Sequence, residues 1–442
     1  MAEKLAIEGG TRAIPPGTHR RWPDIQQEDH EALQAVLRRG ELWGANGTEV
    51  TALQDEWASY VGTDYCLAVN SGTAALHCAV VAVGVGPGDE VIVPAFSFIA
   101  TPMSVLHAGA VPVFCDIEPT TFNIDVSKIE ERITPRTKAI MPVHIHGVVA
   151  DIDEIQAIAD RHGLAVIEDA AQAHGSKYKG RNAGTLGACA AFSLNGAKNL
   201  SAGEGGLFVT DDEQVHLAAR RLAIFGEDTP PLEKGEFRAF WSHGIGWNYR
   251  THELTAALAR SQLRRLDGYN ETARRNAALL TDGLRQLPGI QPPEIPDDRV
   301  SGFHRYRFRF EPSELGFDGP PVVLRDRLLH ALKAEGVAVS TWQTLPLPSS
   351  PVFRQGKFTA WYQDMGQESL EPWDPDSYPE TTRLLEQSLV LGPEMEPLYV
   401  QSAEMMERYL EVFERLVSRL DVVFAADYEP VRVRPRIPAE SL

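Results

Sequence analysis

The chain has few cysteines and little positive charge. Its four cysteines are scattered without a C-x-x-C pair, which is typical of buried thiols in a reducing compartment. The 442 residues include 42 Lys and Arg against 61 Asp and Glu, so the formal net charge is −19. Nucleic acids and anionic membranes attract positive surfaces, so neither is an expected partner. Any anionic ligand must be held by a local site.

Long apolar runs, internal repeats and low-complexity segments are also missing. No stretch approaches the ~20 uninterrupted apolar residues of a membrane span. Residues 1–22 contain no long apolar core, so no signal peptide is expected. With ordinary proportions of hydrophobic (43%) and charged (23%) residues, the composition predicts a cytoplasmic globular protein.

What the sequence does contain is an alternation of short apolar runs and helical patterns between about residues 49 and 225. Strands are expected at 65–70, 89–96, 111–117, 138–145 and 164–170. Continuous apolar strands separated by helices predict an α/β fold, with a mostly parallel sheet sandwiched by helices. Ligands of such sheets bind at the carboxyl ends of the strands.

The length favours two domains. We expect a large domain over 1–265, including an N-terminal arm, and a smaller C-terminal α+β domain over 266–442. A long helical pattern over 251–289 connects them. A Pro- and aromatic-rich stretch at about 355–378 predicts an insertion loop, whose two Trp either pack it down or face a substrate or partner.

Lys198 and Asp169 carry the functional prediction. Asp169 ends an apolar strand pattern, and Lys198 follows 29 residues later in a Ser-, Asn- and Gly-rich segment. A lysine can form a Schiff base with the aldehyde of pyridoxal 5′-phosphate (PLP). An acid can keep the pyridine nitrogen protonated, so that the ring accepts electrons. Taken singly, the acid can be a structural cap and the lysine a solvated charge, but together they predict a PLP enzyme with no metal.

A phosphate site is predicted where the strand at 65–70 meets the next helix. Ser71, Gly72 and Thr73 stand at this junction, and N–H groups at a helix N-terminus beside two hydroxyls bind anions. Simple N-capping by Ser71 is the alternative. Ser193, five residues before Lys198, can add a third hydroxyl.

Other side chains are candidates for contacts to the rest of the cofactor. Gln172 follows Asp169 by three residues and can donate to the phenolic oxygen. Either Phe96 or Phe98, after the strand at 89–96, can stack on the pyridine ring. Packing inside the protein is the alternative for all three. Asn248 and Arg250, in the run WNYR, can bind anions.

These motifs resemble the DegT/StrS-type family of PLP-dependent sugar and aminocyclitol aminotransferases, which has the fold type I architecture. The resemblance covers about residues 3–425 and is carried by runs such as VNSGTAALHCA, VIEDAAQAHGSKYKGR, FSLNGAKNLSAGEGG and GWNYRTHELTAALARSQL. It implies that Lys198 is the Schiff-base lysine and that Asp169 pairs with the pyridine nitrogen. It also implies a homodimer with shared active sites.

The resemblance assigns roles to the remaining candidates as well. The phosphate is expected to bind Gly72, Thr73 and Ser193. Phe98 rather than Phe96 is expected to stack on the ring, and Gln172 to lie near the hydroxyl. Asn248, with Arg250, is expected to reach the phosphate in the neighbouring subunit.

The implied reaction moves an amino group from an amino acid, L-glutamate or L-glutamine, to a keto-sugar or cyclitol ketone in amino-sugar or antibiotic biosynthesis. Asn195 replaces a His found in many sugar-acting members, and His146 replaces a Tyr. Both are expected to border the substrate cavity, which leaves nucleotide-linked sugars, free sugars, cyclitols and benzoquinoid ketones open. A same-fold enzyme of dehydration or aromatisation and a non-catalytic regulator are the alternative functions. Lys198 argues against the dehydratase subgroup, which has His there.

Overall fold

The computed structural model describes residues 4–44, 47–228, 241–354 and 375–431. At its centre is a seven-stranded sheet with the order β1-β9-β8-β5-β4-β2-β3. The strands are β1 Tyr65–Val69, β2 Glu90–Pro94, β3 Val111–Cys115, β4 Thr137–Ile140, β5 Ala165–Asp169, β8 Cys189–Ser193 and β9 Gly206–Thr210. All pairs are parallel except those that β9 makes with β1 and β8. The predicted mostly parallel sheet is confirmed.

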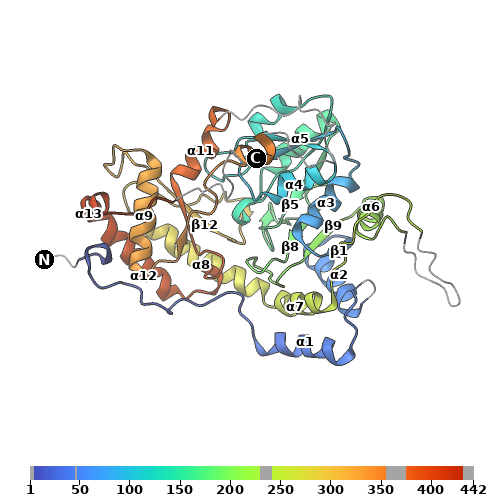
Figure 1. Ribbon diagram of the computed structural model, residues 1–442, viewed down its shortest axis with the longest axis horizontal. Coiled ribbons are helices and arrows are strands. Elements are labelled where there is room, and N and C mark those ends of the chain that lie inside the picture. Colours follow the sequence, from blue (N-terminus) through green and yellow to red (C-terminus); the bar gives the residue numbers. More distant parts are fainter. Residues whose placement is uncertain (1–3, 45–46, 229–240, 355–374, 432–442) are drawn as a thin grey trace.

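Helices cover both faces of this sheet (Figure 1). Side chains alternate between the faces along β1, so that Cys66 and Ala68 join one buried cluster while Leu67 and Val69 join the other. One face is covered by α2 Thr48–Val61, α5 Ile152–His162 and α7 Glu253–Leu263, and the other by α3 Gly72–Ala82, α4 Ala100–His107 and α6 Glu213–Ala223. Burial on both faces explains why the strands are continuously apolar.

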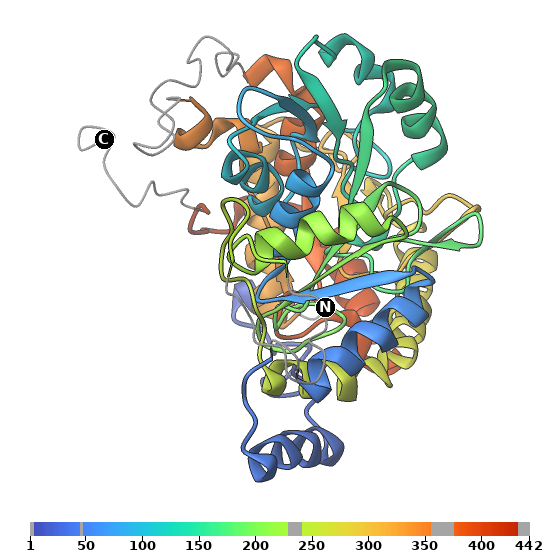
Figure 2. The same cartoon turned by 90° about the vertical axis from the view of Figure 1, so that its right-hand side faces the viewer.

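A second, antiparallel sheet of order β10-β12-β14-β13 lies beside the first. It comprises β10 Ile290–Gln291, β12 Tyr306–Phe310, β13 Val339–Ser340 and β14 Ser388–Leu391. It shares a buried cluster with α8 Leu266–Leu284, α9 Pro321–Glu335 and α12 Ala403–Val417. The N-terminal residues Leu5 and Ile14 also belong to this cluster. The helix α1 Gln27–Arg39 lies instead against α7, at the lower edge of the molecule in Figure 1 and Figure 2.

The helical pattern over 251–289 forms two helices rather than one. α7 ends at Leu263 and α8 begins at Leu266. Arg265 lies between them and donates to Asp29 at 2.7 Å and to the Tyr269 hydroxyl at 3.0 Å. These bonds stabilise the interruption between the two helices.

Three further expectations concern burial and the insertion. All four cysteines are free and buried, as predicted. No helix within the described ranges is long and apolar enough to cross a membrane. Most of the predicted insertion, with both of its Trp, lies outside the described residues; at its end Tyr378 is buried.

Candidate active site

A cavity of about 350 Å³ brings together most of the predicted site residues. It lies at the carboxyl ends of β1, β5 and β8, where parallel strands place their ligands. Its lining includes eight of the ten candidates: Ser71, Gly72, Thr73, Phe98, Asp169, Gln172, Ser193 and Lys198. Residues from several strand ends thus meet in one space, because β5 and β8 are neighbours in the sheet and β1 is separated from β8 only by β9.

Lys198 lies in a turn after β8. Its backbone N–H donates to the Asn195 carbonyl at 2.8 Å, and the Asn195 side chain accepts from the N–H of Ala197 at 3.1 Å. Burial, followed by the nearby Arg305 guanidinium, lowers the pKa of Lys198 to about 8. About a tenth of this side chain is therefore a free amine at pH 7, far more than for an ordinary lysine.

Asp169 is a buried carboxylate, 4% exposed. It accepts from the Thr101 hydroxyl at 2.7 Å and from the Ala171 N–H at 3.2 Å, and no described cationic side chain forms an ion pair with it. Burial raises the pKa of Asp169, and its hydrogen bonds and Lys198 only partly oppose this rise. A positively charged ligand group beside Asp169 would stabilise its ionised form.

The start of α3 forms a cradle suited to a phosphate. The N-capping hydroxyl of Ser71 accepts from the Ala74 N–H at 3.0 Å, so the capping role is present. The N–H groups of Gly72 and Thr73 lie in the first turn of α3, where backbone N–H groups have no acceptor within the helix. A Cβ atom at Gly72 would lie 2.7 Å from the Cβ of Ser193. Only glycine lets these two segments meet.

The two phenylalanines differ in exposure. Phe98 is 52% exposed and lines the cavity. Phe96 is 1% exposed and packs edge-on against His146 and Trp342. Phe98 is thus the one whose side chain is available to a ligand.

Asn248 and Arg250 do not line this cavity. Arg250 donates to the Asn248 side chain at 2.9 Å, and the Asn248 carbonyl accepts from Asn70 at 3.3 Å. Their expected contact with the cofactor of a neighbouring subunit stays a prediction. Of the two positions where the chain departs from the family pattern, Asn195 lines the cavity, whereas His146 lies behind Gln172 and does not. The expectation that both border the cavity is wrong for His146.

Sequence reasoning missed several lining residues, of which Arg305 is the most informative. It is 5% exposed and donates to the Gly392 carbonyl at 3.3 Å and to Glu394 at 3.1 Å. Its Nε has no acceptor among the residues that the structure describes. The lining residues Glu204, Trp342 and Glu394 were missed as well, and so was Thr101, which lies outside the lining and donates to Asp169. The one available signal for Arg305 was its place directly before the strand pattern that forms β12, where a charged side chain can face a ligand.

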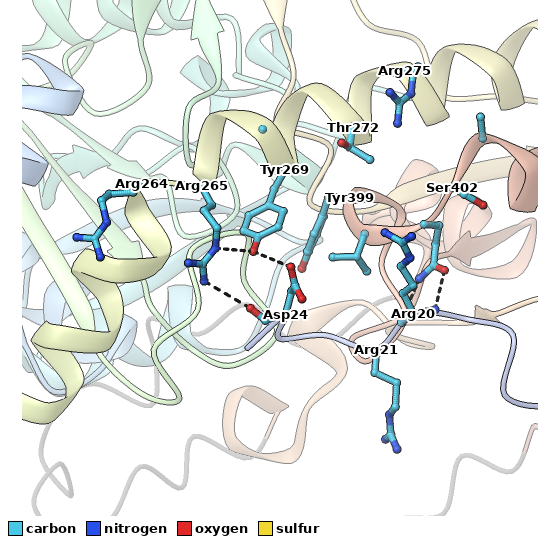
Figure 3. Close-up of a pocket in the computed structure, with 14 residues that line it drawn as sticks. Arg20, Arg21, Asp24, Arg264, Arg265, Tyr269, Thr272, Arg275, Tyr399 and Ser402 are labelled. Atoms are coloured by element: carbon cyan, nitrogen blue, oxygen red, sulfur yellow. Dashed lines mark hydrogen bonds between the residues drawn. The ribbon is translucent and has the colours of Figure 1, made fainter. Parts of the chain in front are cut away.

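A larger cavity of about 700 Å³ lies between the N-terminal segment and α8. Figure 3 shows Arg20, Arg21, Arg264, Arg265 and Arg275 around it, with Arg265 bonded to Tyr269 and Asp24 bonded to the same hydroxyl. It contains none of the predicted site residues. Tyr399 stands between the two cavities, since it lines this one and its hydroxyl donates to the Ala197 carbonyl at 3.2 Å.

Comparison with known proteins identifies the family. The model of the DegT/DnrJ/EryC1/StrS aminotransferase family matches residues 23–364. The chain belongs to this family. It is therefore an enzyme of the aminotransferase type, and its central sheet is that of the fold type I aminotransferases.

The relatives that this chain resembles differ in function. The chain is 40% identical over 336 residues to a pleiotropic regulatory protein of Geobacillus stearothermophilus, covering 75% of this chain and 84% of that protein. It is 39% identical over 352 residues to L-glutamine:2-deoxy-scyllo-inosose aminotransferase of Streptomyces lividus, covering 76% and 80%. The PLP form of a putative sugar aminotransferase from Streptococcus pneumoniae superposes with a TM-score of 0.76 at 25% identity, covering 92% and 99%.

Proposed function

We propose that this protein is a PLP-dependent aminotransferase that moves an amino group from L-glutamate or L-glutamine to the ketone of an uncharged cyclitol or sugar. One observation carries the proposal. A single cavity joins an amine of lowered pKa at Lys198, a buried carboxylate without a cation at Asp169, and an anion cradle at Gly72 and Thr73.

The residues present fit PLP at each of its distinctive groups. The start of α3 and the Ser193 hydroxyl would hold the phosphate, and Asp169 would face the pyridinium nitrogen. Phe98 would cover the ring. When bound, PLP supplies an aldehyde that links to amines and a ring that accepts electrons.

Lys198 and Asp169 have different roles: Lys198 transfers protons, and Asp169 supplies a charge. With a pKa of about 8, Lys198 can accept a proton from the substrate carbon that carries the nitrogen and can return one. Asp169 would carry a negative charge when the pyridinium nitrogen of the bound cofactor lies beside it. The hydrogen bonds from Thr101 and Ala171 fix the orientation of its carboxylate.

Arg305 is the group suited to the carboxylate of the amino donor. It is the one guanidinium that lines the cavity in the described part of the chain. Glu394 occupies only part of its hydrogen-bonding capacity, and the Glu394 side chain is 57% exposed. Arginine binds carboxylates with paired N–H groups, so the donor can share this guanidinium.

The donor half of the reaction provides the first test. Addition of L-glutamate or L-glutamine alone to the PLP-loaded protein should produce pyridoxamine phosphate, detected by mass spectrometry. Arg305→Gln should raise the donor concentration for half-saturation about 10- to 100-fold, because a charge-assisted hydrogen bond is lost. Arg309→Gln, on the strand β12 that directly follows Arg305 but outside this lining, is the matched control. If no amino acid yields pyridoxamine phosphate, the enzyme is not a transaminase, and dehydration or aromatisation becomes the better function.

The charge of the cavity favours an uncharged acceptor. Glu204 and Glu394 both line it and are exposed, and Asn195 donates to Glu204 at 2.8 Å. Lys198 and Arg305 are the only lysine and arginine in the described lining, and both have other roles. Carboxylates accept hydrogen bonds from hydroxyl groups but repel a diphosphate.

A screen of ketones with a ¹⁵N-labelled donor tests the acceptor class. Cyclitol and free-sugar ketones should gain the label, and nucleotide-linked keto-sugars should not. Glu204→Gln should lower kcat/KM for the preferred ketone about 10-fold, since a charged acceptor becomes neutral. The exposed Glu404, which forms an ion pair with Arg408 on its own helix, gives the control Glu404→Gln. Faster turnover of a nucleotide-linked sugar would contradict the uncharged acceptor while leaving the transaminase in place.

A further inference from the structure

The side chain of Gln172 contacts His146 at one end and lines the active-site cavity. Its Oε1 accepts from the backbone N–H of His146 at 2.8 Å and lies 3.3 Å from the ring Nδ1. A backbone N–H can only donate, so the amide oxygen must be on this side. The amide nitrogen therefore points away from His146. No described residue accepts a hydrogen bond from it, although Gln172 is only 3% exposed.

His146 adopts an unusual conformation to make both contacts. Its φ is 56° and its ψ is 11°, in the left-handed region that non-glycine residues rarely occupy, at a cost of about 1–2 kcal/mol. It is 4% exposed. The conformation lets the backbone N–H and the ring of one residue reach the same oxygen of Gln172.

Arg307 determines which ring nitrogen of His146 carries the proton. Its Nε donates to His146 Nε2 at 3.0 Å. A guanidinium has no acceptor, so Nε2 must be unprotonated and the proton must lie on Nδ1. From there it is donated to Gln172. The two obligate donors, Arg307 and the backbone of His146, thus require the same orientation of the amide.

Arg307 is fixed by contacts that are unusual for a buried cation. It is 1% exposed, and no carboxylate in the described ranges forms an ion pair with it. It donates to Ser388 Oγ and to the Trp342 carbonyl, both at 2.7 Å. Its guanidinium also lies 5.1 Å from the ring centre of Phe96. A buried charge without a counter-ion is destabilising, which points to a use other than stability.

The charges around His146 keep it neutral. Burial lowers its pKa well below the ordinary value, and Arg307, Arg305 and Lys198 lower it further. The hydrogen bond to Gln172 opposes this only in part. The ring therefore keeps one proton, on Nδ1, through the neutral pH range.

We propose that Arg307 and His146 are positioning residues that lock the amide of Gln172 with its N–H₂ group toward the cavity, so that the site presents a donor to an anionic ligand oxygen. The identification of that oxygen as the phenolic oxygen of PLP rests on the proposed function. The orientation itself does not.

A neutron crystal structure of the protein without cofactor tests the orientation directly. Deuterium should appear on Nδ1 of His146 and not on Nε2, and the Gln172 amide should carry its two deuterons on the side away from His146. Deuterium on Nε2, or the opposite amide orientation, would overturn the proposal. Because this experiment needs no PLP, its result stands even if the proposed function fails.

The consequence for the cofactor is measured by the pH at which the absorption band of bound PLP changes. A donor at the phenolic oxygen stabilises its anion. Arg307→Met and His146→Phe weaken the hold on the Gln172 amide but keep the backbone N–H of residue 146, so each should raise this midpoint by less than about one unit. Ser388→Ala removes another partner of Arg307 but leaves its bond to His146. It should lower Tm without moving the midpoint.

If Arg307→Met does not fold, Gln172→Glu provides a second test of the same donor. The carboxylate can still accept from His146 but offers no donor to the cavity, so the midpoint should rise as well. A midpoint that stays at the wild-type value in Gln172→Glu and in a folded His146→Phe would overturn the role of the donor. A shift of equal size in Ser388→Ala would show a general packing effect and would also overturn it.

Discussion

Lys198→Ala should lower turnover by more than about four orders of magnitude, because the variant loses both the covalent attachment point and the general base. It should also lose the visible absorption band of lysine-bound PLP, while the cradle at Gly72 still permits weak binding of the free cofactor. Turnover, the absorption spectrum and borohydride reduction followed by peptide mass spectrometry measure these effects. In the wild type, the reduced adduct should map to position 198.

Lys179→Ala is the control for this experiment. Its side chain is half-exposed and forms a surface ion pair with Asp153, so its loss should change neither the spectrum nor turnover. An unchanged band in Lys198→Ala, or an adduct on another lysine, would mean that the cavity around residue 198 is not where the cofactor is attached.

Asp169→Asn should retain PLP but lose about three orders of magnitude in turnover, because a neutral amide no longer holds the proton on the pyridine nitrogen. Thr101→Val, which removes the 2.7 Å bond to the same carboxylate, should give a smaller loss. Turnover close to the wild-type rate in Asp169→Asn would rule out the pairing with the pyridine nitrogen.

Asp169→Asn should lower turnover but should not lower the stability of the cofactor-free protein. Burial raises the pKa of Asp169, so the folded protein binds this proton more tightly than the unfolded chain. Wild-type stability without cofactor should therefore fall as pH rises from the unfolded pKa through the folded pKa, and Asp169→Asn should lack this fall. At neutral pH the cofactor-free variant should melt no lower than the wild type, whereas PLP should raise Tm more in the wild type. Thermal melts with and without PLP test both statements.

The parts of the site that the sequence predicts are those encoded locally. Asp169 and the Ser71–Thr73 junction each end a strand pattern, and parallel strands bring such ends together. Five of the seven strands of the central sheet follow from the same apolar runs, whereas β8 and β9 were not predicted, and the antiparallel direction of β9 has no local signal. The break at Arg265 depends on Asp29, far away in the chain, and so a single helix was expected over 251–289.

Residues that act through distant contacts could not be placed from the sequence. Thr101 meets Asp169 across 68 residues and Arg307 meets His146 across 161. In the run RYRFRF, alternation is typical of a strand with one exposed face, yet Arg307 is enclosed. His146 was expected at the cavity wall, and its left-handed backbone turns it toward Gln172 instead.

The N-terminal segment joins the two halves of the molecule. Leu5 and Ile14 pack with the small sheet, α1 lies on α7, and between them Trp22 is wedged between Tyr269 and Tyr399 at ring distances of 4.9 and 4.7 Å. This segment therefore contacts both the small sheet and a helix of the large sheet. Because Trp22 packs against Tyr269 and Tyr399 at once, a displacement of one sheet relative to the other would disturb contacts made by the N-terminal segment.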